Sequence, residues 1–231
     1  MGRWIGAAPA IVRSVSRTGS QSLSSAMSEA TIFIVDDDHD LRATLVDLVE
    51  TAGLKAEAYA SANEFTAVCQ SSREGCLVVD IHMPGMDGLE LQQQLKDDRI
   101  DIPVVVITGR GDVPKAVKAL KAGAVDFIEK PFSGEHVLTS IRRALEISKR
   151  NREKDQFAIG AAERHERLTP REREVLDHLV VGDSNKVIAA KLDISPRTVE
   201  VHRARVMEKM QAQSLSHLVR MVLAVRTDES A

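Results

Sequence analysis

Short apolar runs and helical patterns alternate along the chain from Thr31 to about Arg152. Runs rich in Val and Ile, each as long as one strand, separate segments whose apolar residues recur every three or four positions. This alternation predicts a doubly wound, five-stranded parallel sheet that helices cover on both faces. The predicted strands are Thr31–Val35, Lys55–Ala60, Cys76–Asp80, Pro103–Thr108 and Ala124–Glu129. The predicted helices are Leu41–Ala52, one capped by Ser61 with Glu64, one near Leu89–Leu95, one near Lys115–Ala122, and a last from about Gly134 to Lys149.

A charged segment separates this front half from the back of the chain. It has no sustained apolar period, so we interpret residues 151–166 as a linker that follows a first domain, residues 29–150. Four helical patterns fill residues 167–231. This last part is therefore predicted to be an all-α domain of four helices.

The helices of the second domain carry clear start and stop signals. The first has Thr169 as its N-cap, Pro170 in its first turn and Glu172 closing a capping box, and it ends at Gly182. The second is the short run NKVIAAKL, the third is PRTVEVHRARVMEKM with Ser195 as its cap, and the fourth is LSHLVRMVLAV. Their order predicts a helix-turn-helix in which the third helix of the domain is the recognition helix.

The third of these helices has two distinct faces. Apolar positions and one histidine recur at offsets of three and four residues, which predicts a buried stripe of Val199, His202, Val206 and Met210. We take His202 to be a core histidine and not a metal ligand. The opposite face is mostly basic, and such a face on a recognition helix is suited to the major groove of double-stranded DNA. The predicted DNA-binding residues are Arg197, Thr198, Glu200, Val201, Arg203, Arg205 and Lys209.

Charge is distributed unevenly between these parts. Residues 29–160 carry 16 Lys and Arg against 23 Asp and Glu, whereas residues 161–231 carry 12 against 11. Residues 1–28 carry three arginines and no acid, and we interpret them as a disordered extension, of which residues 1–26 are without function or come from an upstream start codon. An acidic front half and a near-neutral back half indicate two domains with different partners.

The remaining composition narrows the class of protein. No apolar run approaches the roughly 18–20 residues of a membrane span, so no membrane partner is expected. Cys69 and Cys76 are the only cysteines and form no CxxC pair, which favours free thiols in a reduced cytoplasmic compartment. No GxxxxGK[ST] loop occurs, so an enzyme that cradles a nucleotide in such a loop is excluded.

The charged and hydroxyl side chains that could react or bind a metal lie where the predicted strands end. Asp36 and Asp37 follow the first strand, Asp80 ends the third, Thr108 ends the fourth and Lys130 follows the fifth. The carboxyl ends of parallel strands meet at one edge of the sheet, so these groups are expected to converge there. Three carboxylates that lie close together need a cation, and oxygen ligands of this kind suit Mg²⁺. A lone acid at the end of a buried strand either has such a partner or is there to react.

The four blocks IFIVDDD, VVDIHMPGMDG, VVVITG and DFIEKPF resemble the receiver domain of two-component response regulators, in order and in spacing. Residues 167–231 resemble the LuxR-type helix-turn-helix, and the combination resembles FixJ-type regulators of the NarL/FixJ group. The resemblance implies a flavodoxin-like receiver and a DNA-binding output domain. It also implies a regulator and not a classical enzyme, although the receiver would assist its own Mg²⁺-dependent phosphotransfer and dephosphorylation.

The resemblance further implies a role for each matching residue. Asp80 would be the phosphoacceptor, Thr108 would bond a phosphoryl oxygen, and Lys130 would balance its charge. Phe127 and Thr108 would form the switch, and the Lys130–Pro131 bond would be cis. The implied Mg²⁺ ligands are Asp36, Asp37, Asp80 and the backbone carbonyl of His82.

The partners implied are a sensor histidine kinase, double-stranded promoter DNA, RNA polymerase and, once Asp80 is phosphorylated, a second copy of the chain. Two alternatives stay open: a regulator that works without phosphorylation, and a receiver that acts mainly through protein–protein contacts. A hydrolase that forms an aspartyl-phosphate is disfavoured, because such enzymes carry a second acid two residues after the nucleophile, where this chain has His82.

Overall fold

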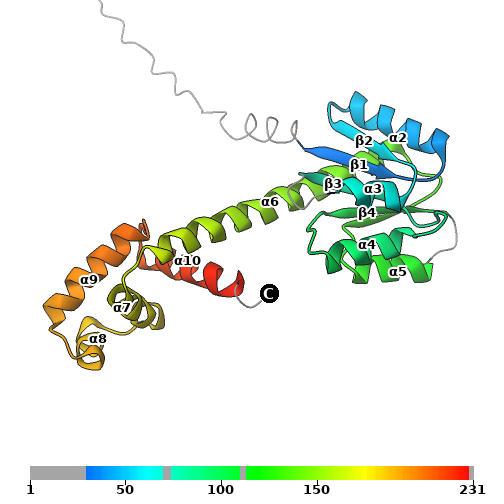
Figure 1. Cartoon of the computed structure of the whole chain (residues 1–231). Coiled ribbons are helices and arrows are strands. Elements are labelled where there is room, and N and C mark those ends of the chain that lie inside the picture. Colours follow the sequence, from blue (N-terminus) through cyan, green and yellow to red (C-terminus); the bar gives the residue numbers. More distant parts are fainter. Residues whose placement is uncertain (1–29, 70–73, 110–112, 229–231) are drawn as a thin grey trace, which may run out of the picture. The chain divides into compact units, whose positions relative to one another are not determined.

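The computed structural model describes residues 30–69, 74–109 and 113–228. The chain divides into two compact units, one ending at Ser148 and one beginning at Lys149 (Figure 1). The predicted N-terminal extension, residues 1–28, lies outside the described residues. No described helix is both long enough and apolar enough to span a bilayer.

The first unit contains the parallel sheet that the sequence predicted. Its strand order is β2-β1-β3-β4-β5, with every neighbouring pair parallel. The strands are β1 (Thr31–Val35), β2 (Lys55–Tyr59), β3 (Gly75–Asp80), β4 (Val104–Thr108) and β5 (Asp126–Glu129). The helices that alternate with them are α2 (His39–Thr51), α3 (Ala62–Val68), α4 (Gly88–Asp97), α5 (Val113–Lys121) and α6 (Gly134–Glu166).

Side chains that alternate along each strand build a core on either face of this sheet. On one face Ile32 and Ile34 of β1 pack in a cluster with residues of α2 and α6 such as Val49 and Ile141. On the other face Phe33 of β1 packs in a cluster with residues of α3, α4 and α5. Because both faces are covered, the central strands are apolar at nearly every position, and polar side chains are left for the strand ends.

The second unit holds the four predicted helices, α7 (Pro170–Val181), α8 (Asn185–Leu192), α9 (Pro196–Lys209) and α10 (Leu215–Asp228). Thr169 and Glu172 form the predicted capping box of α7, and Gly182 ends that helix in the left-handed conformation. Ser195 caps α9, where its side chain accepts a hydrogen bond from the backbone N–H of Thr198. These local signals were therefore confirmed.

The last helix of the front half is longer than predicted. It was expected to end near Lys149 and to be followed by a linker, but α6 continues as a helix to Glu166. Ala161, inside the expected linker, is fully buried in the core of the second unit with Leu168 and Val175. The sequence pattern hid this helix, because its residues are good helix formers whose few core contacts create no apolar period.

Candidate functional site

Four residues lie at the carboxyl edge of the first unit's sheet. Asp80 is the last residue of β3 and is 4% exposed, and Asp36 follows β1 and is 2% exposed. Thr108 ends the neighbouring strand β4 and is fully buried. Lys130 directly follows β5, and its backbone N–H donates to the carbonyl of Thr108 over 2.7 Å. The fold thus brings together residues that are up to 94 positions apart in the chain.

Lys130 is the cation of this site. Its Nζ lies 2.8 Å from Oδ1 of Asp80 and 3.2 Å from Oδ2 of Asp36. Burial alone would lower the pKa of Lys130, but the hydrogen bonds and charges of Asp80 and Asp36 raise it above its ordinary value. The ammonium is therefore charged across the physiological range. The bond from Lys130 to Pro131 is cis, as predicted.

The other oxygen of Asp80 is held by the loop that follows the strand. The backbone N–H of His82 donates to Oδ2 of Asp80 over 2.8 Å. Gly88 begins α4 so close to this strand end that a Cβ placed on it would lie 2.3 Å from the carbonyl oxygen of Asp80. Only glycine fits at this approach, and it fixes where α4 starts relative to the carboxylate.

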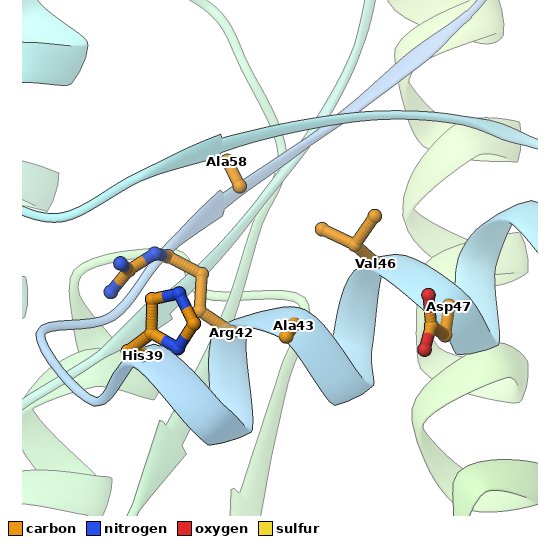
Figure 2. Close-up of a pocket in the computed structure, with 6 residues that line it drawn as sticks. All are labelled: His39, Arg42, Ala43, Val46, Asp47 and Ala58. Carbon is orange, nitrogen blue, oxygen red and sulfur yellow. The ribbon is translucent and has the colours of Figure 1, made fainter.

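Asp36 is held in place by its own neighbours. Its Oδ1 accepts the backbone N–H of Asp38 over 2.9 Å, and its carbonyl accepts a guanidinium N–H of Arg42 over 2.6 Å. Arg42 also borders a hollow of about 250 Å³ between α2 and β2, where its side chain lies next to that of His39 (Figure 2). Burial raises the pKa of Asp36, and the nearby charge of Asp80 raises it further, against the opposing effect of Lys130.

The carboxylates at this edge are fewer than the sequence predicted. Asp37 is exposed, and within residues 30–69, 74–109 and 113–228 no three His, Cys, Asp or Glu side chains are grouped so that they could hold one ion. Asp36 and Asp80, however, reach the same ammonium, so their carboxylates are near enough to share a small cation. Mg²⁺ commonly takes one or two carboxylates and completes its shell with water and phosphate oxygens. The pair therefore fits this metal without a third acid.

Phe127 lies in β5 and is partly buried against the core that contains α5. The side chain of Asp126 fixes the backbone of Phe127 and is itself held by a hydrogen bond that the sequence did not predict. Asp126 accepts the N–H of Phe127 over 2.8 Å through one oxygen and the hydroxyl of Ser140, on α6, over 2.5 Å through the other. Ser140 is 2% exposed and 14 residues away, and no local motif marks it.

Helix α9 carries the predicted DNA-binding residues of the second unit. Val199, Val206 and Met210 are fully buried, which confirms most of the predicted stripe, whereas His202 is only partly buried. Of the predicted DNA-binding residues, those that are exposed are Arg197, Glu200, Val201 and Arg205. Thr198 is partly buried, and Arg203 is partly buried with one guanidinium N–H donating to Oδ1 of Asn185 on α8 over 3.4 Å. The predicted DNA-binding face of α9 therefore carries two exposed arginines, Arg197 and Arg205, and a third arginine, Arg203, that is hydrogen-bonded to the neighbouring helix.

Lys209 differs from the other predicted contacts. Its Nζ lies 2.6 Å from Oε2 of Glu172, a carboxylate on α7 whose side chain is 3% exposed. The same ammonium donates to the carbonyl of Arg167 over 3.3 Å. Burial raises the pKa of Glu172, but the hydrogen bonds from Lys209 and from Thr169 outweigh it and lower the pKa to about 2. The expectation that Lys209 lies on the DNA-facing side did not foresee this internal ion pair.

The chain matches two protein families. Residues 32–142 match the response regulator receiver domain, and residues 166–222 match the bacterial regulatory proteins of the luxR family. The chain is 49% identical over 198 residues to the transcriptional regulatory protein FixJ of Rhizobium meliloti, covering 86% of this chain and 97% of FixJ. It is 44% identical over 189 residues to the response regulator protein TodT of Pseudomonas putida, covering 82% of this chain and 83% of TodT.

Solved structures of response regulators are similar to this chain over most of its length. The response regulator StyR matches 84% of this chain and 98% of its own at 39% identity, with a TM-score of 0.73. Full-length FixJ from B. japonicum matches 86% of this chain and 98% of its own at 42% identity, with a TM-score of 0.53. The chain therefore belongs to the FixJ-type two-component response regulators, in which a receiver domain precedes a LuxR-type helix-turn-helix domain that binds DNA.

Proposed function

We propose that this regulator is switched by phosphorylation of Asp80, with a sensor histidine kinase as the phosphoryl donor. The position and the contacts of Asp80 support this proposal. It is a nearly buried carboxylate at a strand end, with one oxygen on the ammonium of Lys130 and the other on the N–H of His82. A carboxylate held in this way is preorganised to attack a phosphorus atom, and its neighbours can bind the charge that is transferred.

The proposed transfer follows from these contacts. An oxygen of Asp80 attacks the phosphorus of a phosphohistidine, the P–N bond breaks, and an acyl phosphate forms on Asp80. Phosphoryl transfer needs little from the protein beyond alignment and positive charge around the transferring oxygens. Lys130 supplies such a charge, because its pKa is raised, and the hydroxyl of Thr108 is proposed to bond one of the new oxygens.

A magnesium ion is the proposed cofactor, held by Asp36, Asp37, Asp80 and the backbone carbonyl of His82, with Asp36 acting partly through water. When bound, it would neutralise charge on the transferring phosphoryl group. Asp36 already shares the ammonium of Lys130 with Asp80, which supports its place in this set. Cys69 and Cys76 are free thiols, which fits the proposed cytoplasmic location.

The proposed output is a dimer on promoter DNA, where RNA polymerase is the expected partner. When the phosphoryl group draws Thr108 toward it, Phe127 packs into the vacated space and the surface of α5 changes. On that surface Val117 and Leu120 are 45% and 51% exposed, which is consistent with a site of association. Dimerisation would set two α9 helices about one DNA turn, roughly 34 Å, apart. The effect of phosphorylation is limited by how much it favours the active state.

Labelling with acetyl phosphate in the presence of Mg²⁺ tests the proposal. Wild type would be run beside Asp80→Asn, which keeps the shape of the side chain, and beside Asp98→Asn, which changes an exposed acid on α4's end. A phosphate-affinity gel should show a label on wild type and on the Asp98 variant but not on the Asp80 variant. Light scattering after size exclusion should show that only labelled protein dimerises.

Two results would contradict the proposal. Labelling of Asp80→Asn would place the acceptor elsewhere, and a labelled wild type that stays monomeric would remove dimerisation as the output. A wild type that takes no label, yet binds promoter DNA fully, would favour a regulator that works without phosphorylation.

A further inference from the structure

The C-terminal end of α9 is anchored to the first turn of α7, within the second unit. Glu172 lies in the first turn of α7, where it closes the capping box by accepting the N–H of Thr169 over 2.8 Å. The same oxygen accepts Nζ of Lys209, the last residue of α9, over 2.6 Å. One buried carboxylate therefore joins the start of one helix to the end of another, 37 residues apart.

Two further contacts connect the same places. Nζ of Lys209 also donates to the carbonyl of Arg167, in the turn before α7. Two residues beyond Lys209, the amide oxygen of Gln211 accepts Nε–H of Arg164, on α6, over 3.1 Å. Gln211 itself has a positive φ of 53°, so the chain turns sharply where α9 ends. The end of α9 is thus tied by side chains to the corner at which α6 passes into α7.

We propose that Glu172 and Lys209 are positioning residues for DNA recognition: together they set the orientation of α9, and Lys209 is not itself a DNA contact. The inference rests on the proposed DNA contacts of α9, since it concerns how the exposed residues of that helix are aimed. Arg197, Glu200 and Val201 lie in the first half of α9, and a small rotation about its anchored end displaces them.

The burial of Glu172 makes the pair asymmetric. The charge of the buried carboxylate is stabilised by the ammonium of Lys209. Removing that ammonium leaves a buried carboxylate without a compensating positive charge. Lys209→Met should therefore disturb the end of α9 more than Glu172→Gln does. In Glu172→Gln the ammonium of Lys209 can turn to solvent, and the neutral amide of Gln can still accept the N–H of Thr169. The double variant should be milder than Lys209→Met alone.

The test measures specificity and salt dependence with the full-length chain. The probes are a duplex selected by wild type from a random-sequence pool and a scrambled duplex of the same composition, both read by fluorescence anisotropy at several salt concentrations. Lys209→Met should lose about tenfold or more in affinity for the selected duplex, with little change on the scrambled one and an unchanged salt slope. Lys209→Arg should restore most of the specificity, because it keeps the charge on Glu172.

Matched variants separate this role from its alternatives. Arg197→Met, on the exposed face, should lower the salt slope by about one, as the loss of a phosphate contact does. Arg226→Met removes an exposed ion pair to Asp177, between α10 and α7, and should leave both affinities near wild type. If Lys209→Met lowers the salt slope as Arg197→Met does, Lys209 is a DNA contact and the inference is overturned.

Other outcomes are equally decisive. Equal losses on both duplexes, or no loss in Glu172→Gln and the double variant, would show that the pair serves stability alone. If Lys209→Met does not fold, Glu172→Gln and Lys209→Arg still give the comparison. If Arg197→Met and all the other variants bind both duplexes as wild type does, the proposal that α9 contacts DNA is wrong. The role of the Glu172–Lys209 pair is then not what failed.

Discussion

Acid should weaken the second unit through Glu172, whose carboxylate is buried and charged. Its pKa is lowered from an ordinary 4.5 to about 2, since the hydrogen bonds of Lys209 and Thr169 outweigh burial. A group with a depressed pKa stabilises the fold fully above its unfolded pKa, and this stability is lost as pH falls toward the folded value. The loss should therefore begin near pH 5 and continue down to about pH 2.

The size of the effect follows from the same pKa. At about 1.4 kcal/mol for each pKa unit, a drop from 4.5 to about 2 corresponds to roughly 3 kcal/mol. Lys209 is 35% exposed, so solvent screens part of the attraction, and we expect about 2 kcal/mol. This is a large share of the 5–15 kcal/mol that typically separates folded from unfolded domains.

Hydrogen exchange measured on peptides from α7 and α9 in the full-length chain checks this prediction. Wild type, Glu172→Gln and Glu174→Gln would be compared at each pH, so that intrinsic exchange rates cancel. Glu174 is the matched control, because it lies on the same helix with 51% of its side chain exposed. Protection in wild type and Glu174→Gln should fall between pH 5 and pH 2 by about 2 kcal/mol relative to Glu172→Gln. Parallel pH curves for wild type and Glu172→Gln would refute the reasoning.

Three further predictions concern the proposed phosphorylation site and the proposed DNA-binding face. Gly88→Ala places a Cβ 2.3 Å from the carbonyl oxygen of Asp80, so acetyl-phosphate labelling should fall at least tenfold; labelling at the wild-type rate would contradict it. Lys130→Met leaves Asp36 and Asp80 without their shared cation and should destabilise the first unit by about 2 kcal/mol in urea unfolding, an effect that lower pH reduces. Arg205→Ala, on the exposed side of α9, should weaken binding to all duplexes alike and reduce the salt slope by about one; a loss confined to one sequence would indicate a base contact instead.

Much of the proposed phosphorylation site could be predicted from the sequence because its residues lie at strand ends. Asp80 and Thr108 are each the last residue of a strand, and in a parallel sheet all such ends share one edge. The alternation of strands and helices was therefore enough to bring them together. It could not show how many acids face inward, and the structure buries Asp36 while Asp37 is exposed.

The second unit shows the same division. The caps at Thr169, Ser195 and Gly182 are local, since each depends on a hydrogen bond or a backbone angle within a few residues, and each could be read from the sequence. The course of α6 could not, because only Ala161 of its second half is fully buried and one small residue makes no period. A segment without an apolar period has the same sequence pattern in a helix as in a linker.

The sequence by itself determined the order of the elements, the helix caps and the set of reactive residues, since periodicity and capping depend on near neighbours. Only the tertiary structure decided which charges are paired across long separations. Lys209 looked like one more basic residue on the face of α9, yet it neutralises a carboxylate 37 residues earlier. Whether a lysine faces DNA or a buried acid depends on how helices pack, because packing alone sets the distance between charges and the water that remains around them.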